Sequence, residues 1–247
     1  MKSSKEDLKN RGYIEDNEII TYYELLTFDE LSILIKSKKA FERTIAIRLL
    51  KNSSDISRLD LTVILLEILV NEKHLYTKIE ICDVLEKGDS EIAEQMLKYV
   101  GKIGKNQHVK LPKEVSKKVS YPLPRDIMAR VMGKMNISIL PTLIEALSNC
   151  DVFEIREVID AIGFLCFYND VTNEGFVVKE LLKCYEKYKY DNIVRWKITM
   201  GLSAFNNEFA ISKLKEIIEK ETEELILKET YRALKLIENR TNIKTPH

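Results

Sequence analysis

The sequence is poor in the residues that interrupt helices. Its 247 residues include 8 glycines and 5 prolines. No proline precedes Pro112, and none lies between Pro141 and Pro246. An interior proline destabilises a helix by about 3 kcal/mol, so two long stretches of the chain are free to be helical. The scarcity of turn residues disfavours β-sandwiches and predicts an all-α fold.

Patterns that bind metals or form disulfide frameworks are also missing. The cysteines are never closer than sixteen positions, no CxxC pair occurs, and there are 3 histidines. This spacing predicts ordinary core thiols in a reduced, intracellular protein, with no metal and no cofactor. The longest apolar run, Val63 to Val70, is interrupted by Glu67 and is far shorter than the ~20 residues that a bilayer requires. We therefore expect a cytoplasmic protein without a membrane partner.

The sequence has no excess of positive or of negative charge. The 39 basic and 39 acidic residues cancel, so the chain as a whole has no strong field for phosphates or anionic membranes. Any role with nucleic acids must therefore be local. Charged residues nevertheless make up 32% of the sequence, which is typical of long helix faces in contact with water.

What the sequence does contain is a series of amphipathic segments. Apolar residues recur with helical spacing at Leu140, Leu143, Ile144 and Leu147. The same pattern predicts about six antiparallel helix pairs: 28–36 with 39–51, 55–70 with 75–86, 90–103 with 125–135, 138–147 with 152–168, 175–188 with 192–205, and 208–220 with 223–239.

Helix starts and repeat spacing support this division. Asp151 with Glu154, and Thr27 with Glu30, have the spacing of capping boxes. If Ser138 caps a helix, Pro141 falls in its first turn, where a missing N–H is harmless. A basic residue near the start of each second helix recurs at intervals of 31 to 47 residues: Arg43, Lys78, Arg125, Arg156, Arg195 and Lys228. Such a drifting period is typical of a helical solenoid.

The stretch from Leu140 to Gly163 resembles a HEAT repeat. It has the proline of the first helix, the turn aspartate Asp151, Arg156 near the start of the second helix, and a closing Ala-Ile-Gly. Arg156 lies one residue nearer Gly163 than in the usual pattern. The resemblance implies a right-handed α–α superhelix whose second helices line a concave groove. It further implies a cap segment at 1–27, one repeat domain at 28–240 and a C-terminal tail at 241–247.

The basic ladder has a structural interpretation in such folds. In HEAT-like proteins this residue commonly bonds to the aspartate or the carbonyls of the preceding turn, which would apply to Arg43, Lys78, Arg156, Arg195 and Lys228. The functional alternative is a charged ridge along the groove. Gly163 and Gly201 lie within predicted helices, where glycine is unfavourable, and we expect close neighbouring helices at both.

The composition changes most between Gly101 and Arg125. This stretch contains seven basic residues, one acidic residue and three of the five prolines, and we interpret positions 104–124 as an insertion within the third pair. Long loops are often functional, so the candidate partner-binding residues are Lys105, Lys110, Lys113, Lys117, Lys118 and Arg125. These side chains can neutralise phosphates or face an acidic partner. The alternative is a tolerated, solvated insertion.

No catalytic motif is recognisable, since the sequence has no Gly-rich phosphate loop, GxSxG or HExxH pattern. We therefore predict a non-enzymatic scaffold or adaptor that recognises a protein or peptide in the groove. The alternative is a nucleic-acid-binding HEAT protein, similar to the HEAT-like glycosylases of alkylated DNA. Those enzymes present tryptophan and aspartate in a basic groove, and here only Trp196, with Asp191 nearby, could serve.

Overall fold

The computed structural model describes residues 4–15 and 23–244, and every regular element in these ranges is a helix. The first helices are α1 (Lys5–Asn10), α2 (Phe28–Leu34), α3 (Ala40–Leu50), α4 (Arg58–Asn71), α5 (Leu75–Leu85) and α6 (Ser90–Leu97). The later ones are α7 (Ile127–Met132), α8 (Leu140–Asn149), α9 (Val152–Tyr168), α10 (Glu174–Lys187), α11 (Asn192–Leu202), α12 (Glu208–Lys220) and α13 (Glu224–Lys244). Short 3₁₀ helices lie at Tyr23–Leu25 (η2) and Ile137–Ile139 (η3). The predicted all-α class is confirmed for these residues.

The chain divides into two compact units, Met1–Gln95 and Met96–His247. The boundary lies inside α6, in the third of the six predicted pairs, so a single repeat domain over 28–240 stays a prediction. The predicted end segments, 1–27 and 241–247, lie in part outside the described residues. Among the helices that the structure describes, none combines the length and the apolarity needed to cross a bilayer.

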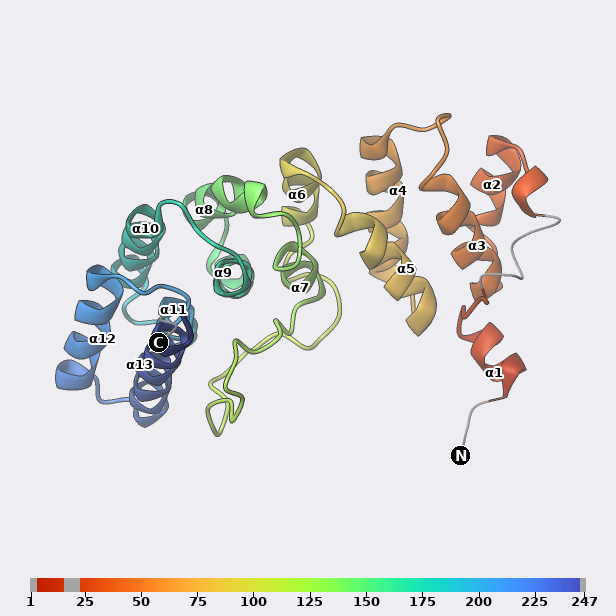
Figure 1. Cartoon of the computed structure of the whole chain (residues 1–247). Coiled ribbons are helices and arrows are strands. Elements are labelled where there is room, and N and C mark those ends of the chain that lie inside the picture. Colours follow the sequence, from red (N-terminus) through yellow and green to blue (C-terminus); the bar gives the residue numbers. More distant parts are fainter. Residues whose placement is uncertain (1–3, 16–22, 245–247) are drawn as a thin grey trace. The chain divides into compact units, whose positions relative to one another are not determined.

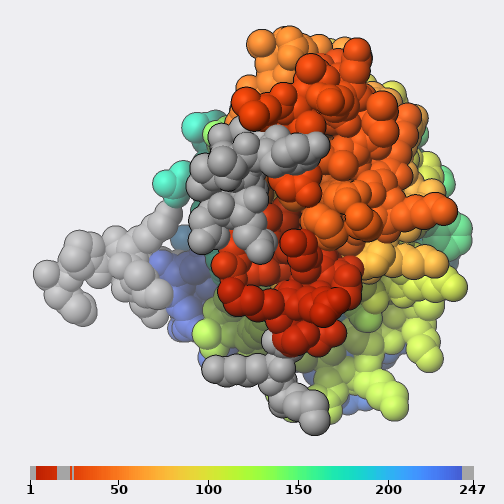
Figure 2. All heavy atoms as spheres, turned by 90° about the vertical axis from the view of Figure 1, so that its right-hand side faces the viewer, coloured from red at the N-terminus to blue at the C-terminus, as the bar shows by residue number. Residues whose placement is uncertain are grey.

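In the first unit α3 is central, because α1, α2 and α5 all pack against it. No residue of α1 is buried, and Figure 2 shows this helix in dark red at the surface of the unit. Gly12 follows α1 with a positive φ of 88°, a conformation that favours glycine. A Cβ at Gly12 would also lie 2.5 Å from the Thr77 hydroxyl and 2.9 Å from that of Thr44, so the turn after α1 lies very close to α3 and α5.

The second unit has two layers (Figure 1). Helices α7, α9, α11 and α13 pack side by side in that order as one layer, which we call the inner layer. Helices α8, α10 and α12 form the other layer, each packing on its inner neighbour. The core between them is apolar and includes Leu143, Ile159, Leu181, Ile198 and Leu214, all buried.

The helix starts follow from local side-chain chemistry. Asp151 accepts hydrogen bonds from the backbone at the start of α9, and Glu154 accepts one in return, which confirms the predicted capping box. The capping box of Thr27 and Glu30 at α2 is likewise confirmed. Pro141 lies in the first turn of α8 as expected. The residue that caps here is Asn136, at the preceding 3₁₀ turn, and not Ser138.

Candidate functional site

The 104–124 segment folds back onto the inner layer of its own unit. Near its end, the Tyr121 side chain is 2% exposed. Its ring lies edge-on to Phe164, with ring centroids 6.2 Å apart, and tilted against Phe167 at 5.7 Å. The Tyr168 hydroxyl donates to the Tyr121 carbonyl oxygen at 3.3 Å. These contacts fix the end of the segment to α9.

Hydrogen bonds from two side chains, Arg232 and Gln107, hold the segment at other points. Arg232 of α13 donates from Nη2 to the carbonyl oxygens of Lys118, at 3.2 Å, and Ser120, at 2.7 Å. The amide of Gln107 donates to Oδ2 of Asp126, the cap of α7, at 2.8 Å. The segment is therefore attached to the inner layer at α7, α9 and α13.

His108 makes the contact with α11. Its ring lies edge-on to that of Trp196, with centroids 4.8 Å apart. Burial, together with the nearby charges of Lys197 and Arg125, lowers the pKa of His108 to about 4. The imidazole is therefore neutral at physiological pH and packs as an aromatic ring.

The predicted partner-binding side chains all point to water. Lys105, Lys110, Lys113, Lys117, Lys118 and Arg125 are exposed. Among the described residues, the one ion pair of this set joins Lys117 to Glu114 on the same segment, at 3.4 Å. Val109 and Val119 are each 82% exposed beside the lysines. The anchored segment thus presents a basic surface with apolar points.

A cavity of about 210 Å³ lies beneath the segment. The inner layer contributes Asp160, Trp196, Met200 and Glu229 to its wall. The segment and the residues that follow it contribute His108, Pro112, Glu114, Ser116, Pro122, Leu123, Pro124 and Arg125.

Ionisable groups are buried beside this cavity. Lys197 of α11 is fully buried, and its ammonium group lies 2.8 Å from carboxylate oxygens of both Glu157 and Asp160 on α9. Burial raises the pKa of Glu157 to about 7, although Lys197 opposes the shift. Burial also raises the pKa of Asp160. Buried charge of this kind is stable only when paired, and Lys197 supplies the pairing.

A second buried carboxylate network joins α11 to α13. Glu229 accepts hydrogen bonds from Trp196 Nε1 at 3.2 Å and from Arg232 Nη1 at 2.6 Å. Arg232 therefore bonds to Glu229 with one nitrogen and to the backbone of the segment with the other. This side chain couples the cavity wall to the position of the segment.

None of these buried acidic residues was predicted as a site residue from the sequence. A signal was nevertheless present, because Glu157, Asp160 and Lys197 interrupt the apolar faces of their helices, next to Val158, Ile159 and Ile198. A charged residue on a buried face must find a partner. The sequence does not show that these three are each other's partners.

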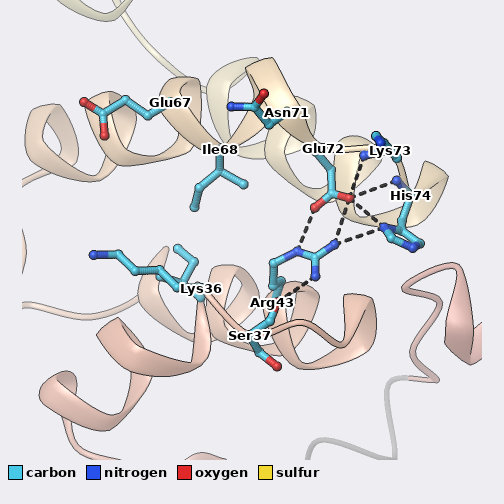
Figure 3. Close-up of a pocket in the computed structure, with 10 residues that line it drawn as sticks. Lys36, Ser37, Arg43, Glu67, Ile68, Asn71, Glu72, Lys73 and His74 are labelled. Atoms are coloured by element: carbon cyan, nitrogen blue, oxygen red, sulfur yellow. Dashed lines mark hydrogen bonds and ion pairs between the residues drawn. The ribbon is translucent and has the colours of Figure 1, made fainter.

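The basic ladder is clearest at Arg43 in the first unit (Figure 3). Its guanidinium donates to both carboxylate oxygens of Glu72 at 2.8 Å and to the Ser37 carbonyl oxygen at 2.7 Å. Glu72 also accepts a hydrogen bond from the backbone N–H of His74. This arginine lines a hollow of about 360 Å³, but its donors are used in linking α3 to the turn between α4 and α5.

Two other ladder arginines repeat this arrangement. Arg156 pairs with Asp191, in the turn before α11, at 2.5 Å. Arg195 pairs with Glu221, in the turn before α13. The expectation placed the acceptor in the turn that precedes each arginine. Arg43 makes the expected contact, because it donates to the carbonyl oxygen of Ser37 in the preceding turn. The carboxylates that pair with Arg43, Arg156 and Arg195 lie instead in the turn of the following helix pair.

The two lysines of the ladder differ. Lys78 makes no ion pair with the part of the chain that the structure describes, and Lys228 pairs with Glu224 of its own helix at 2.6 Å. A lysine cannot form the forked contact of a guanidinium. Arg125, at the corresponding place in the third pair, is exposed beside the cavity.

Trp196 and Asp191, the pair required by the nucleic-acid-binding alternative, do not form the expected site. Asp191 caps α11 and pairs with Arg156. Trp196 is buried under His108, and its acidic neighbours are Glu229, which it contacts, and Asp160, on the same cavity wall. Of the nearby tyrosines, Tyr185 is buried and Tyr190 is 89% exposed.

In the described ranges, no group of three or more His, Cys, Asp or Glu side chains is placed to hold a metal ion, and the cysteines there form no disulfide. The chain matches no protein-family model, and no significantly similar protein was found among curated sequences or solved structures.

Proposed function

We propose that this chain is a non-enzymatic binding protein with the right-handed superhelical architecture of HEAT-like solenoids, and that it recognises an acidic protein or peptide. The observation that carries the proposal is the anchored basic surface of the 104–124 segment. The ladder supports the architecture, because Arg43, Arg156 and Arg195 each link one helix pair to the next, as a stacked repeat requires.

The position of the segment changes where the partner would bind. A HEAT-like groove is lined by second helices, and in the second unit these are α7, α9, α11 and α13. The 104–124 segment contacts all four through Gln107, Tyr121, His108 and Arg232. We therefore place the partner on the lysines of the segment, and not on the bare helices beneath it.

Anchoring makes this surface suited to recognition. A loop whose backbone is already held loses little conformational freedom on binding, which leaves more of the interaction energy for affinity. Lysines speed and orient the encounter with an acidic surface, and exposed Val109 and Val119 offer apolar contacts between the charges. An acidic stretch with one or two apolar side chains fits this pattern.

The nucleic-acid alternative has less support. Phosphates would also bind the lysines, but stacking of a base on Trp196 requires removal of His108, which packs on the ring. Asp191 is committed to Arg156. Binding of duplex DNA would reveal itself by salt dependence, since each phosphate contact adds about 0.9 to the log–log slope.

The test compares two charge-reversed proteins. In the first, Lys105, Lys110, Lys113, Lys117 and Lys118 are changed to glutamate. In the control, Lys187, Lys189, Lys215, Lys220 and Lys235, which are also exposed in the second unit, are changed to glutamate. The net charge changes equally, so the two proteins differ in the position of the change.

Partners are captured from cells by quantitative pull-down, and the recovered protein is then purified and titrated against each variant. We expect a stoichiometric partner whose affinity falls at least tenfold with the segment variant and stays close to wild type with the control. Equal affinity for both variants would refute the proposed surface. Salt-dependent binding to duplex DNA with no protein partner would favour the alternative.

A further inference from the structure

The cavity beneath the 104–124 segment has the chemistry of a ligand site that is separate from the lysine surface. Its volume of about 210 Å³ is below the ~300–1,000 Å³ typical of sites for drug-sized molecules, so a ligand must be small. Asp160 and Glu229 supply carboxylates to its wall, and Trp196 and His108 supply aromatic rings.

The buried charges around this cavity do not balance. Three carboxylates, on Glu157, Asp160 and Glu229, face two cations, on Lys197 and Arg232, and none of these side chains is more than 10% exposed. Arg232 already serves Glu229, and Lys197 is shared by the other two. With all three carboxylates ionised, the cluster lacks one positive charge. Burial raises the pKa of Glu157 to about 7, so near neutral pH an amine competes with a proton for this excess negative charge.

Two carboxylate oxygens of this cluster, Glu157 Oε2 and Asp160 Oδ1, have no hydrogen-bond partner among the described residues, and of these two residues Asp160 lines the cavity. Asp160 is 3% exposed, and its Oδ2 oxygen is bound by Lys197, while Oδ1 has no hydrogen-bond partner. Nδ1 of His108, which also lines the cavity, is buried without a partner. A buried polar atom without a partner is unfavourable, so a ligand with N–H donors would be favoured at Asp160.

We propose that this cavity binds a small organic ammonium ion, a primary or secondary amine that donates to Asp160 Oδ1 and packs against the ring of Trp196. The positive charge neutralises the excess carboxylate, and a cation beside a tryptophan ring is attracted by the π electrons. The organic class is favoured over a metal ion because the described residues offer no cluster of metal ligands. A neutral molecule of the same shape leaves the charge excess in place.

The protein carries its own probe for this site. Trp196 is its single tryptophan, so tryptophan fluorescence reports on the cavity alone. The full-length protein is titrated with alkylammonium ions from ethylammonium to butane-1,4-diammonium. The matched pair is 3-methylbutylammonium and 3-methylbutan-1-ol, which differ in the ammonium and hydroxyl groups. We expect a saturable fluorescence change with an ammonium ion, and binding of the alcohol at least about tenfold weaker.

Two substitutions locate the effect. Asp160→Asn should weaken ammonium binding at least tenfold, while Glu219→Gln, at an exposed position of α12, should leave it unchanged; circular dichroism confirms that both proteins fold. If Asp160→Asn does not fold, His108→Ala serves in its place, with weaker binding expected. No response to any ammonium ion, equal responses to the amine and the alcohol, or full binding by a folded Asp160→Asn protein would overturn the proposal. A response to Mg²⁺, Ca²⁺ or Zn²⁺ in place of the amines would do so as well.

This inference and the proposed function fail separately. The five-lysine variant retains Asp160, Trp196 and His108, so it should bind the ammonium ion as the wild type does. Loss of the acidic partner by that variant says nothing about the cavity.

Discussion

The side chain of Tyr121 fills the space that a side chain at Gly163 would need. A Cβ atom at Gly163 would overlap the Tyr121 hydroxyl oxygen, well inside the 3.0 Å below which real Cβ atoms essentially never approach another heavy atom. At Gly201 the nearest atoms are 3.9 Å away, an ordinary contact. An unusually close approach therefore occurs at Gly163 but not at Gly201, where the neighbouring helix α9 lies at ordinary contact distance. The space at Gly163 is occupied by Tyr121 of the 104–124 segment, and the atoms nearest to Gly201 belong to Ile159 of α9 and to Tyr121.

Gly163→Ala should displace Tyr121 and lower the free energy of unfolding by about 1–3 kcal/mol, the usual effect of overpacking. Because His108 and Tyr121 belong to the same segment, fluorescence of Trp196 should also change. Chemical denaturation and fluorescence check both effects. Gly201→Ala is the control, and we expect it to be neutral or to stabilise by up to about 1 kcal/mol, since alanine favours helix over glycine. Similar losses in the two variants would contradict this account.

Removal of the Arg43 guanidinium should leave the Glu72 carboxylate buried without its cation, with the hydrogen bonds from the backbone N–H groups of Lys73 and His74 still in place. The Glu72 side chain is 2% exposed, so Arg43→Ala should lower the free energy of unfolding by about 3–5 kcal/mol. Arg43→Lys retains the charge but not the fork, and should give an intermediate loss. Lys78→Ala, at a ladder position without an ion pair among the described residues, should change stability by less than about 0.5 kcal/mol. Urea denaturation of the three proteins measures the differences.

The same pair should make stability depend on pH. Although burial opposes ionisation of Glu72, hydrogen bonds from Arg43 and the His74 backbone lower its pKa from 4.5 to about 2. A carboxyl group whose pKa is lower in the folded than in the unfolded protein stabilises the fold at pH values above the pKa of the unfolded chain. For Glu72 this contribution is lost as the pH falls from about 4.5 toward 2. The difference in stability between wild type and Arg43→Ala should therefore shrink over that range. A difference independent of pH would show that Glu72 is not the affected group.

Glu157 should have the opposite dependence on pH. Burial raises its pKa from 4.5 to about 7, so the folded protein holds a proton that the unfolded chain releases between these values. Its unfavourable contribution is then present above about pH 7 and fades as the pH falls to 4.5. Glu157→Gln should be most stabilising relative to wild type near pH 8 and least near pH 5. Denaturation of both proteins at several pH values measures this difference. Both proteins contain His108, so the titration of His108 cancels in the comparison.

Arg232→Lys should loosen the 104–124 segment without removing the positive charge beside Glu229. The lysine can still pair with that carboxylate, but it lacks the second nitrogen that holds the carbonyl oxygens of Lys118 and Ser120. Trypsin should then cut after Lys117 or Lys118 several times faster than in wild type, which mass spectrometry detects. Equal rates of cleavage would mean that Tyr121 and His108 hold the segment by themselves.

Much of the helical organisation follows from local rules. The capping boxes at Thr27 and Asp151 and the place of Pro141 in a first turn are as predicted. The loop between α6 and α7 is longer than predicted, because α6 ends at Leu97 and not at 103. Each of the confirmed features depends on residues a few positions apart, where helix periodicity and backbone hydrogen bonding leave few alternatives. For the same reason the arginines of the ladder were recognisable, although their carboxylate partners in the following pair were not.

Local sequence patterns were sufficient to predict that the chain is helical, that a lysine-rich segment interrupts the helices, and, to within three residues, where the helices from α2 onward begin. They did not predict α1. Three features became visible only when the helices were packed together: the segment covers the inner layer of the second unit, Tyr121 requires Gly163, and Lys197 joins two carboxylates of another helix. These contacts link residues far apart in the chain. Their energies depend on burial and distance, which arise when the layers pack and which no local pattern specifies.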